Sequence, residues 1–124
     1  MKITDFKCTG DLNLPPYTPN ILNADEGLYI KTICMENKQK WGDHYDVHSL
    51  YGHSMAIVTY ETLDELFPDR RTFVLTRSQF AGTNKYAGHW LGDNQSFWSN
   101  MGWSIIGMLE YSLFGFSYTG ADIW

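Results

Sequence analysis

Asp93 is the residue whose surroundings point most directly to acid–base chemistry. It lies in the segment 88–94, GHWLGDN, where small and aromatic neighbours are expected to limit its hydration. A poorly hydrated carboxyl group tends to keep its proton near neutral pH, and a general acid requires this. Asp93 could instead only cap the helix expected after it, and the sequence leaves both roles open.

Arg77 and Asp122 each follow a short segment with the pattern of a buried strand. Residues 72–76 (TFVLT) precede Arg77, and residues 116–121 (FSYTGA) precede Asp122. In βα folds, chemistry gathers at the C-terminal ends of the strands, so both side chains are expected to hydrogen-bond substrate hydroxyls in a polar cleft. Arg77 could instead only pair with a carboxylate that holds the rim of the fold together.

The elements that would position these residues alternate between helices and strands. Apolar periodicity and turn residues predict helix 45–67, strand 72–76, helix 95–113 and strand 116–121. A glycine-rich loop is expected over 78–92, and residues 1–44 are expected to be mostly loop. This order is typical of βα units. A closed (β/α)8 barrel needs about 250 residues, so the α/β chain is expected to supply only part of one.

Composition narrows the class of partner. The chain has 124 residues, enough for one domain or part of a larger one, and a formal charge of −5, which argues against nucleic acid. Aromatic residues make up 16% and could either fill a core or stack on the apolar faces of sugars or bases. The sequence contains neither a signal peptide nor an apolar run of about 18 residues, so we expect no membrane segment.

Other reactive side chains show weaker patterns. His44 and His48 have the spacing that places them on one helix face, but a further ligand in register and an HExxH motif are missing, so we expect no metal and no cofactor. Cys8 and Cys34 are 26 positions apart, which fits either a disulfide or two buried thiols. A glycosylation sequon at Asn94 carries little weight because such triplets are common.

Taken together and in order, the motifs of the chain resemble glycoside hydrolase family 31, the α-glucosidases, and most of all its maltase-glucoamylase and sucrase-isomaltase branch. The motifs are PPY (15–17), KTICM (31–35), YDVHSLYG (45–52), TRS (76–78), FAG (80–82), YAGHW (86–90), GDN (92–94), SIIGMLE (104–110) and GADI (120–123). They cover nearly the whole chain, which makes the resemblance far more specific than a lone glycine motif.

The resemblance implies a TIM barrel that removes terminal α-linked glucose from maltose- and starch-type oligosaccharides by a retaining mechanism, without a cofactor. Asp93 matches the general acid/base of the family, and Arg77, Trp90 and Asp122 match residues that line the glucose subsite. The Cys8 and Cys34 positions match a disulfide of relatives. This pairing implies an extracellular, brush-border or lysosomal origin.

Departures from the family are equally informative. The sequence lacks the WxDMNE-type motif that supplies the nucleophilic Asp, and it ends at Trp124 before the expected Cys-Gly-Phe and the downstream subsite His. We therefore expect residues 1–124 to be an internal part of the catalytic barrel, roughly strands five to seven, and to be inactive alone. The alternative is a non-catalytic carbohydrate-binding or decoy fragment.

Overall fold

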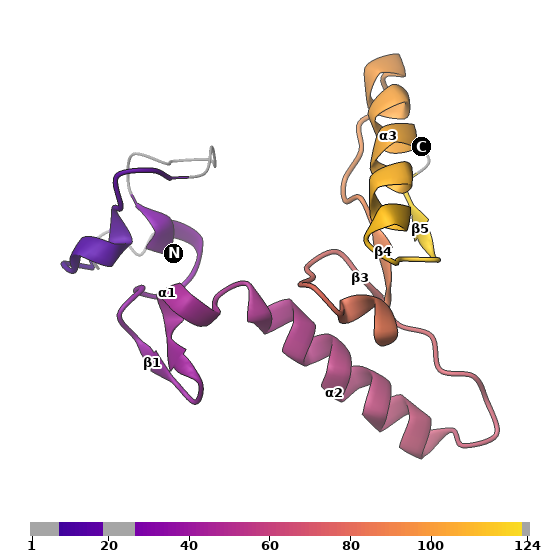
Figure 1. Cartoon of the computed structure of the whole chain (residues 1–124), viewed down its shortest axis with the longest axis horizontal. Coiled ribbons are helices and arrows are strands. Elements are labelled where there is room, and N and C mark those ends of the chain that lie inside the picture. Colours follow the sequence, from indigo (N-terminus) through magenta and orange to yellow (C-terminus); the bar gives the residue numbers. More distant parts are fainter. Residues whose placement is uncertain (1–7, 19–26, 123–124) are drawn as a thin grey trace, which may run out of the picture. The chain divides into compact units, whose positions relative to one another are not determined.

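The computed structural model describes residues 8–18 and 27–122. Contacts divide the chain into two compact units, one up to His48 and the other from Ser49 onward. Figure 1 shows their helices and strands. Within the described residues, no helix has both the length and the apolar character needed to cross a bilayer.

The first unit consists mainly of loops with a few short elements, as expected for residues 1–44. These are two 3-10 helices at Asp11–Asn13 and Leu28–Lys31, an antiparallel pair formed by β1 (Lys38–Gln39) and β2 (Gly42–Asp43), and the short helix α1 (His44–Val47). Strands of two residues and a helix of one turn contribute little stability by themselves. Other interactions must therefore hold this unit together.

A disulfide and a buried asparagine provide these interactions. Cys8 and Cys34 form a disulfide. Asn13 is 2% exposed; its Oδ1 accepts a hydrogen bond from the backbone N–H of Met35 at 2.9 Å, and its Nδ2 donates to both carboxylate oxygens of Glu36 at 2.7 and 2.8 Å. The covalent bond and the Asn13 network join the same two segments of chain.

The second unit is a small parallel sheet with two helices. Its elements are α2 (Leu50–Leu66), β3 (Leu75–Thr76), β4 (Gly88–Trp90), α3 (Trp98–Leu113) and β5 (Thr119–Gly120). The strands lie in the order β3-β4-β5, and both pairs are parallel. His89 in the central strand is opposite Thr76 on one side and Thr119 on the other. Helix α3 packs beside β5 (Figure 1).

The predicted element order is largely confirmed, with two errors. The helix expected over 45–67 is interrupted, because α1 ends at Val47 and α2 begins at Leu50. The structure places a helix and a strand where each was expected, although the paired parts of the two strands are shorter than 72–76 and 116–121. The expected loop over 78–92 is wrong because it contains β4, the central strand of the sheet. Within residues 8–18 and 27–122 the three strands of this sheet do not close on themselves, as expected for part of a (β/α)8 barrel.

Two contacts attach α2 to the loop that follows β3. Gly52 approaches this loop so closely that a Cβ atom there would lie 2.6 Å from the Cβ of Ser78, so only glycine fits. At the next residue of α2, Nδ1 of His53 lies 2.8 Å from Oγ1 of Thr83, whose side chain is fully buried. These contacts fix the start of the segment that leads away from Arg77.

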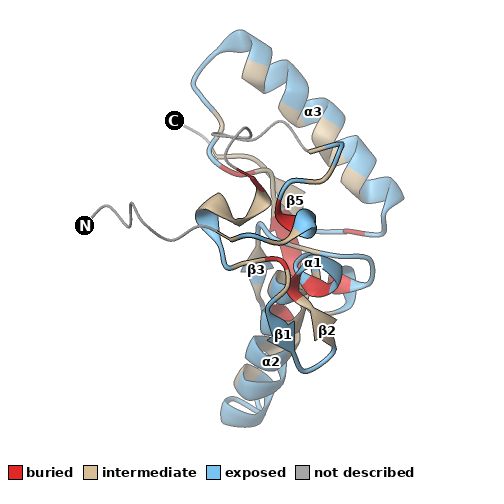
Figure 2. Cartoon of the chain, turned by 90° about the vertical axis from the view of Figure 1, so that its left-hand side faces the viewer, coloured by how far each residue is buried: buried red, intermediate tan, exposed pale blue. Residues whose placement is uncertain are grey.

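Apolar residues on both helices are exposed, although apolar residues at helical spacing normally face a core. On α3, Trp98 is 85% exposed and Leu109 is 65% exposed; on α2, Val58 is 62% exposed. Figure 2 shows both helices mostly pale blue, with the buried residues gathered around the strands. The periodicity identified the helices correctly, but no described element of this unit covers these faces.

Candidate active site

Four candidate residues follow the C-terminal ends of three neighbouring strands. Arg77 comes directly after β3, Trp90 ends β4 with Asp93 three positions later, and Asp122 follows β5 by two positions. Parallel strands end at the same edge of their sheet, so the fold gathers residues from distant parts of the sequence at one edge. This is the edge at which βα folds carry their chemistry.

Arg77 lies against the backbone that leads to Asp93. Gly92 has φ = +98°, which favours glycine, and a Cβ atom there would lie 2.7 Å from Nε and 3.0 Å from Cζ of Arg77. Glycine is therefore required both by the backbone conformation and by the nearby guanidinium group. The structure gives no carboxylate partner for Arg77, because the ion pair between Lys38 and Asp43 is the only one within residues 8–18 and 27–122.

Asp93 is exposed in this chain, so the expected exclusion of water from its carboxyl group is wrong here. The residues on either side of it are less exposed, since Gly92 is buried and Asn94 is half-buried. The helix-cap alternative is also wrong. Helix α3 begins at Trp98, and its N-cap position is Phe97, which makes no side-chain capping bond.

Trp90 and Asp122 line one pocket of about 600 Å³ on the sheet. Its walls include Phe73 and Tyr118, whose rings meet edge to face at a centroid distance of 5.9 Å. Arg77 and Asp93 do not line this pocket. The four candidate residues therefore share an edge of the sheet, whereas only two of them, Trp90 and Asp122, line the same open pocket.

His89 has a structural role that its sequence did not reveal. Its side chain is 4% exposed, and its ring stacks on Tyr111 with the centroids 3.9 Å apart. Its Nδ1 lies 3.1 Å from the carbonyl oxygen of Thr76, so this nitrogen must carry the proton and donate. This bond joins the central strand to the residue immediately before Arg77.

Burial lowers the pKa of His89 below its usual 6.5, although hydrogen bonds to the backbone of Thr76 and Arg77 partly oppose the shift. The neutral ring is therefore favoured in the folded state. Below about pH 6.5, His89 in the unfolded chain binds a proton that the folded chain binds less readily. The contribution of the neutral ring to the free energy of unfolding is therefore fully present above this pH and is lost as the pH is lowered.

We expect an NMR titration of the His89 ring to give a midpoint below 6.5, and the acid-induced loss of stability to be smaller in His89→Gln. Denaturant melts of the two proteins between pH 5.5 and 7.5 would measure the difference. A His89 midpoint at or above 6.5, or equal pH slopes for the two proteins, would contradict the prediction.

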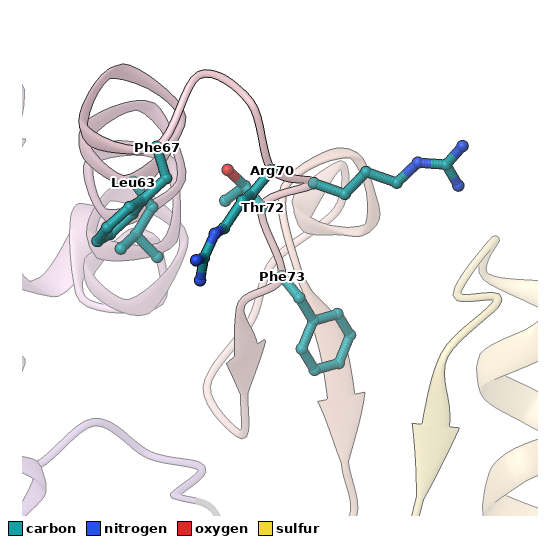
Figure 3. A pocket seen from close by; sticks show the side chains of 6 residues that line it. Leu63, Phe67, Arg70, Thr72 and Phe73 are labelled. Carbon is teal, nitrogen blue, oxygen red and sulfur yellow. The ribbon is translucent and has the colours of Figure 1, made fainter.

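A smaller pocket of about 150 Å³ lies on the approach to β3, before the strand begins. Leu63 and Phe67 from the end of α2 form one side, and Thr72 and Phe73 form the other. Figure 3 shows the side chain of Arg70 extending between these two sides. Because this pocket is at the N-terminal end of β3, it is separate from the four candidate residues.

The two histidines of the first unit face each other. Nε2 of His44 lies 2.9 Å from Nδ1 of His48 and 3.0 Å from Oγ1 of Thr32. Burial, and secondly the neighbouring His48, lower the pKa of His44. In the parts of the chain that the structure describes, no three His, Cys, Asp or Glu side chains come together as metal ligands would.

Comparison with known proteins agrees with this geometry. The family model for the glycosyl hydrolases family 31 TIM-barrel domain matches residues 11–123. The intestinal sucrase-isomaltase of Homo sapiens is 59% identical over 112 residues, which are 90% of this chain and 6% of that protein. The probable maltase-glucoamylase 2 of Homo sapiens is 48% identical over 115 residues, 93% of this chain and 4% of that protein.

A solved structure leads to the same family. The glucosidase II alpha subunit in its Tris-bound form superimposes with a TM-score of 0.69 at 37% identity, and the match covers 74% of this chain and 10% of that one. The chain thus spans only a small part of its relatives, and the family expected from its motifs is confirmed. It belongs to glycoside hydrolase family 31, within the TIM-barrel domain.

Proposed function

We propose that this chain forms part of the catalytic barrel of a retaining α-glucosidase that releases terminal glucose from maltose- and starch-type oligosaccharides. The observation that carries the proposal is the position of Arg77, Trp90, Asp93 and Asp122 at one edge of three adjacent parallel strands, in a member of family 31. Within the barrel, β3, β4 and β5 correspond roughly to strands five to seven.

Each of the four residues has a chemical role in this proposal. Asp93 protonates the glycosidic oxygen as it leaves and later removes a proton from the attacking water. Arg77 and Asp122 hydrogen-bond glucose hydroxyls, and Trp90 offers an apolar wall to the sugar ring. The exposed position of Asp93 leaves it accessible to both a leaving group and water.

The nucleophile must come from outside these 124 residues, because no WxDMNE-type motif occurs in the sequence. Retaining hydrolysis needs two carboxyl groups about 5–5.5 Å apart across the scissile bond. The Cys8–Cys34 disulfide supports an oxidising location, such as the cell exterior or the lysosomal lumen.

A second candidate function is carbohydrate binding without catalysis. The pocket lined by Trp90 and Asp122 favours it, because this pocket is formed within the chain itself while the attacking carboxylate is missing. The two functions share a ligand, an α-glucoside oligosaccharide, and differ in whether bond cleavage follows.

We expect the purified chain to give no detectable hydrolysis of maltose or of an aryl α-glucoside, because a double displacement cannot begin without a nucleophile. A sensitive fluorogenic assay would measure this, with Asp93→Asn as the control for contaminating activity. Turnover that Asp93→Asn abolishes would show that the chain is catalytic alone. Titration with an α-glucosidase inhibitor, with binding at millimolar concentration or tighter, would support the carbohydrate-binding function.

A further inference from the structure

We infer that Asn94 is a site of N-linked glycosylation, and that its glycan covers the edge of the sheet that carries Asp93 and Asp122. Asn94, Gln95 and Ser96 form an N-x-S sequon whose middle residue is not proline. Such triplets are common by chance, so the inference depends on where the structure places this one. Its second half rests on the proposed function, because that function is what the glycan blocks.

The sequon lies in a loop at the surface. It comes after β4, which ends at Trp90, and before α3, which begins at Trp98. Gln95 and Ser96 are exposed, and Asn94 is half-buried. A used sequon belongs in a surface loop of a secreted protein, because the attached glycan is bulky and needs solvent around it.

The amide group of Asn94 is not held by the protein. Its Oδ1 is buried and accepts no hydrogen bond, and among the described residues no side-chain hydrogen bond engages its Nδ2. Asn94 lines an open pocket of about 710 Å³, which Asp122 also lines. The structure therefore leaves space beside this side chain for an attached sugar.

Two exposed aromatic rings border the same pocket. Phe97 is 63% exposed and Trp98 is 85% exposed, and they follow Asn94 by three and four positions. Aromatic rings offer an apolar surface on which the apolar face of a sugar ring can stack. The first sugar of a glycan at Asn94 would find this surface within its reach.

The modification takes place where an oligosaccharide is carried on a lipid pyrophosphate, in the lumen of the secretory pathway. Nδ2 of Asn94 attacks C1 of the first sugar, so that a C–N bond forms while the C–O bond to the pyrophosphate breaks. The lipid pyrophosphate leaves, and Nδ2 loses one proton. The Cys8–Cys34 disulfide supports an oxidising compartment of this kind.

The position of the glycan has a consequence for the proposed active site. Asn94 directly follows Asp93, the proposed proton donor, and shares a pocket with Asp122. An oligosaccharide that brings its glycosidic oxygen to Asp93 must use the space that the glycan fills. Glycosylation therefore divides the protein into an unmodified form with an open edge and a modified form that is closed to substrate.

The first experiment measures the mass of the full chain secreted from cultured animal cells behind a cleavable signal peptide. We expect a glycan that peptide N-glycosidase F removes, leaving aspartate at position 94. Ser96→Ala and Gln95→Pro should each abolish the glycan although both keep Asn94. Ser96→Thr and Gln95→Ala are the matched controls and should keep it, because both preserve the sequon. Mass spectrometry of the denatured protein makes the result independent of whether a variant folds.

The second experiment titrates the glycosylated chain and the Ser96→Ala chain with deoxynojirimycin, a glucose-shaped inhibitor. We expect the inhibitor to bind the Ser96→Ala chain and to lose measurable binding to the glycosylated chain. Enzymatic removal of the glycan should restore binding. The matching Asn94→Asp variant has the same sequence as the deglycosylated product and should bind equally well.

The outcomes separate this inference from the proposed function. A secreted chain with the mass of the polypeptide alone would overturn the inference, even if the inhibitor binds. A glycan at Asn94 with equal binding by both forms would overturn the covering of the edge. A glycan at Asn94 with no binding by either form would support the modification and contradict the proposed glucose site.

Discussion

Asp93→Asn is expected to lower kcat/KM for maltose by about 10²- to 10⁴-fold in a complete family 31 barrel that carries this chain's sequence. Such a barrel can be made by replacing the matching 112 residues of human sucrase-isomaltase, which are 59% identical, with those of this chain. Asparagine is close to aspartate in shape but can neither donate nor accept the catalytic proton. The expected loss is therefore chemical and requires no change in the fold.

The dependence on the leaving group gives this prediction a sharper test. An α-glucosyl substrate whose leaving group needs no proton should lose much less activity in the glycosylation step than maltose does. Added azide should then restore part of the second step, because it attacks the glycosyl-enzyme without a general base. Asp69→Asn, which changes an exposed aspartate in the turn after α2, is the matched control and should leave kcat/KM unchanged. Equal losses for all substrates would show that Asp93 contributes only a contact.

The sequence predicted the catalytic edge of the sheet better than it predicted the sheet itself. Arg77 and Asp122 were identified because each follows an apolar, β-rich segment, a signal that depends only on neighbours in the chain. Strand β4 gave no such signal, because Gly88–Trp90 is short, begins with glycine and does not alternate. It is a strand because β3 and β5 pair with it on both sides, and this pairing is made by residues far away in the sequence.

One indication of β4 was nevertheless present. Asp93 is expected to be a functional residue, and functional residues of βα folds follow strands. A strand is therefore expected just before Asp93. The same dependence on distant residues explains the errors about burial. Periodicity predicts which face of a helix is apolar, but whether Leu109 or Val58 is covered depends on elements that local sequence does not describe. Hydration of Asp93 likewise depends on its spatial neighbours.

The first unit shows a different limit of sequence analysis. The prolines and glycines of this unit correctly predicted that it is mostly loop. Secondary-structure propensity alone could not show which interactions hold such a segment in a fixed structure. In the structure, Asn13 and the Cys8–Cys34 disulfide do this, and only Met35 and Val47 are buried apolar residues among those described in this unit. A small apolar core of this kind makes the covalent link a dominant contribution to stability.

Removal of this disulfide is accordingly expected to unfold the first unit. Closing a loop with a sequence separation of 26 stabilises the folded state by about 3.5 kcal/mol through the entropy of the unfolded chain. In the double variant Cys8→Ser, Cys34→Ser, the amide protons of Met35 and Tyr45 should lose their protection from hydrogen exchange. Both are hydrogen-bonded at 2.9 Å in the folded unit, to Oδ1 of Asn13 and to the carbonyl oxygen of Met35.

Reduction of the unmodified chain with dithiothreitol should reproduce the loss of protection. It breaks the same bond but leaves both cysteines in place as thiols. The agreement of both treatments would separate the cross-link from any effect of the serine side chains. Protection that persists in the double variant would mean that the Asn13 network, with its bonds to Met35 and Glu36, holds the two segments together without the covalent link. The disulfide would then be evidence of an oxidising compartment, and its contribution to the stability of the first unit would be small.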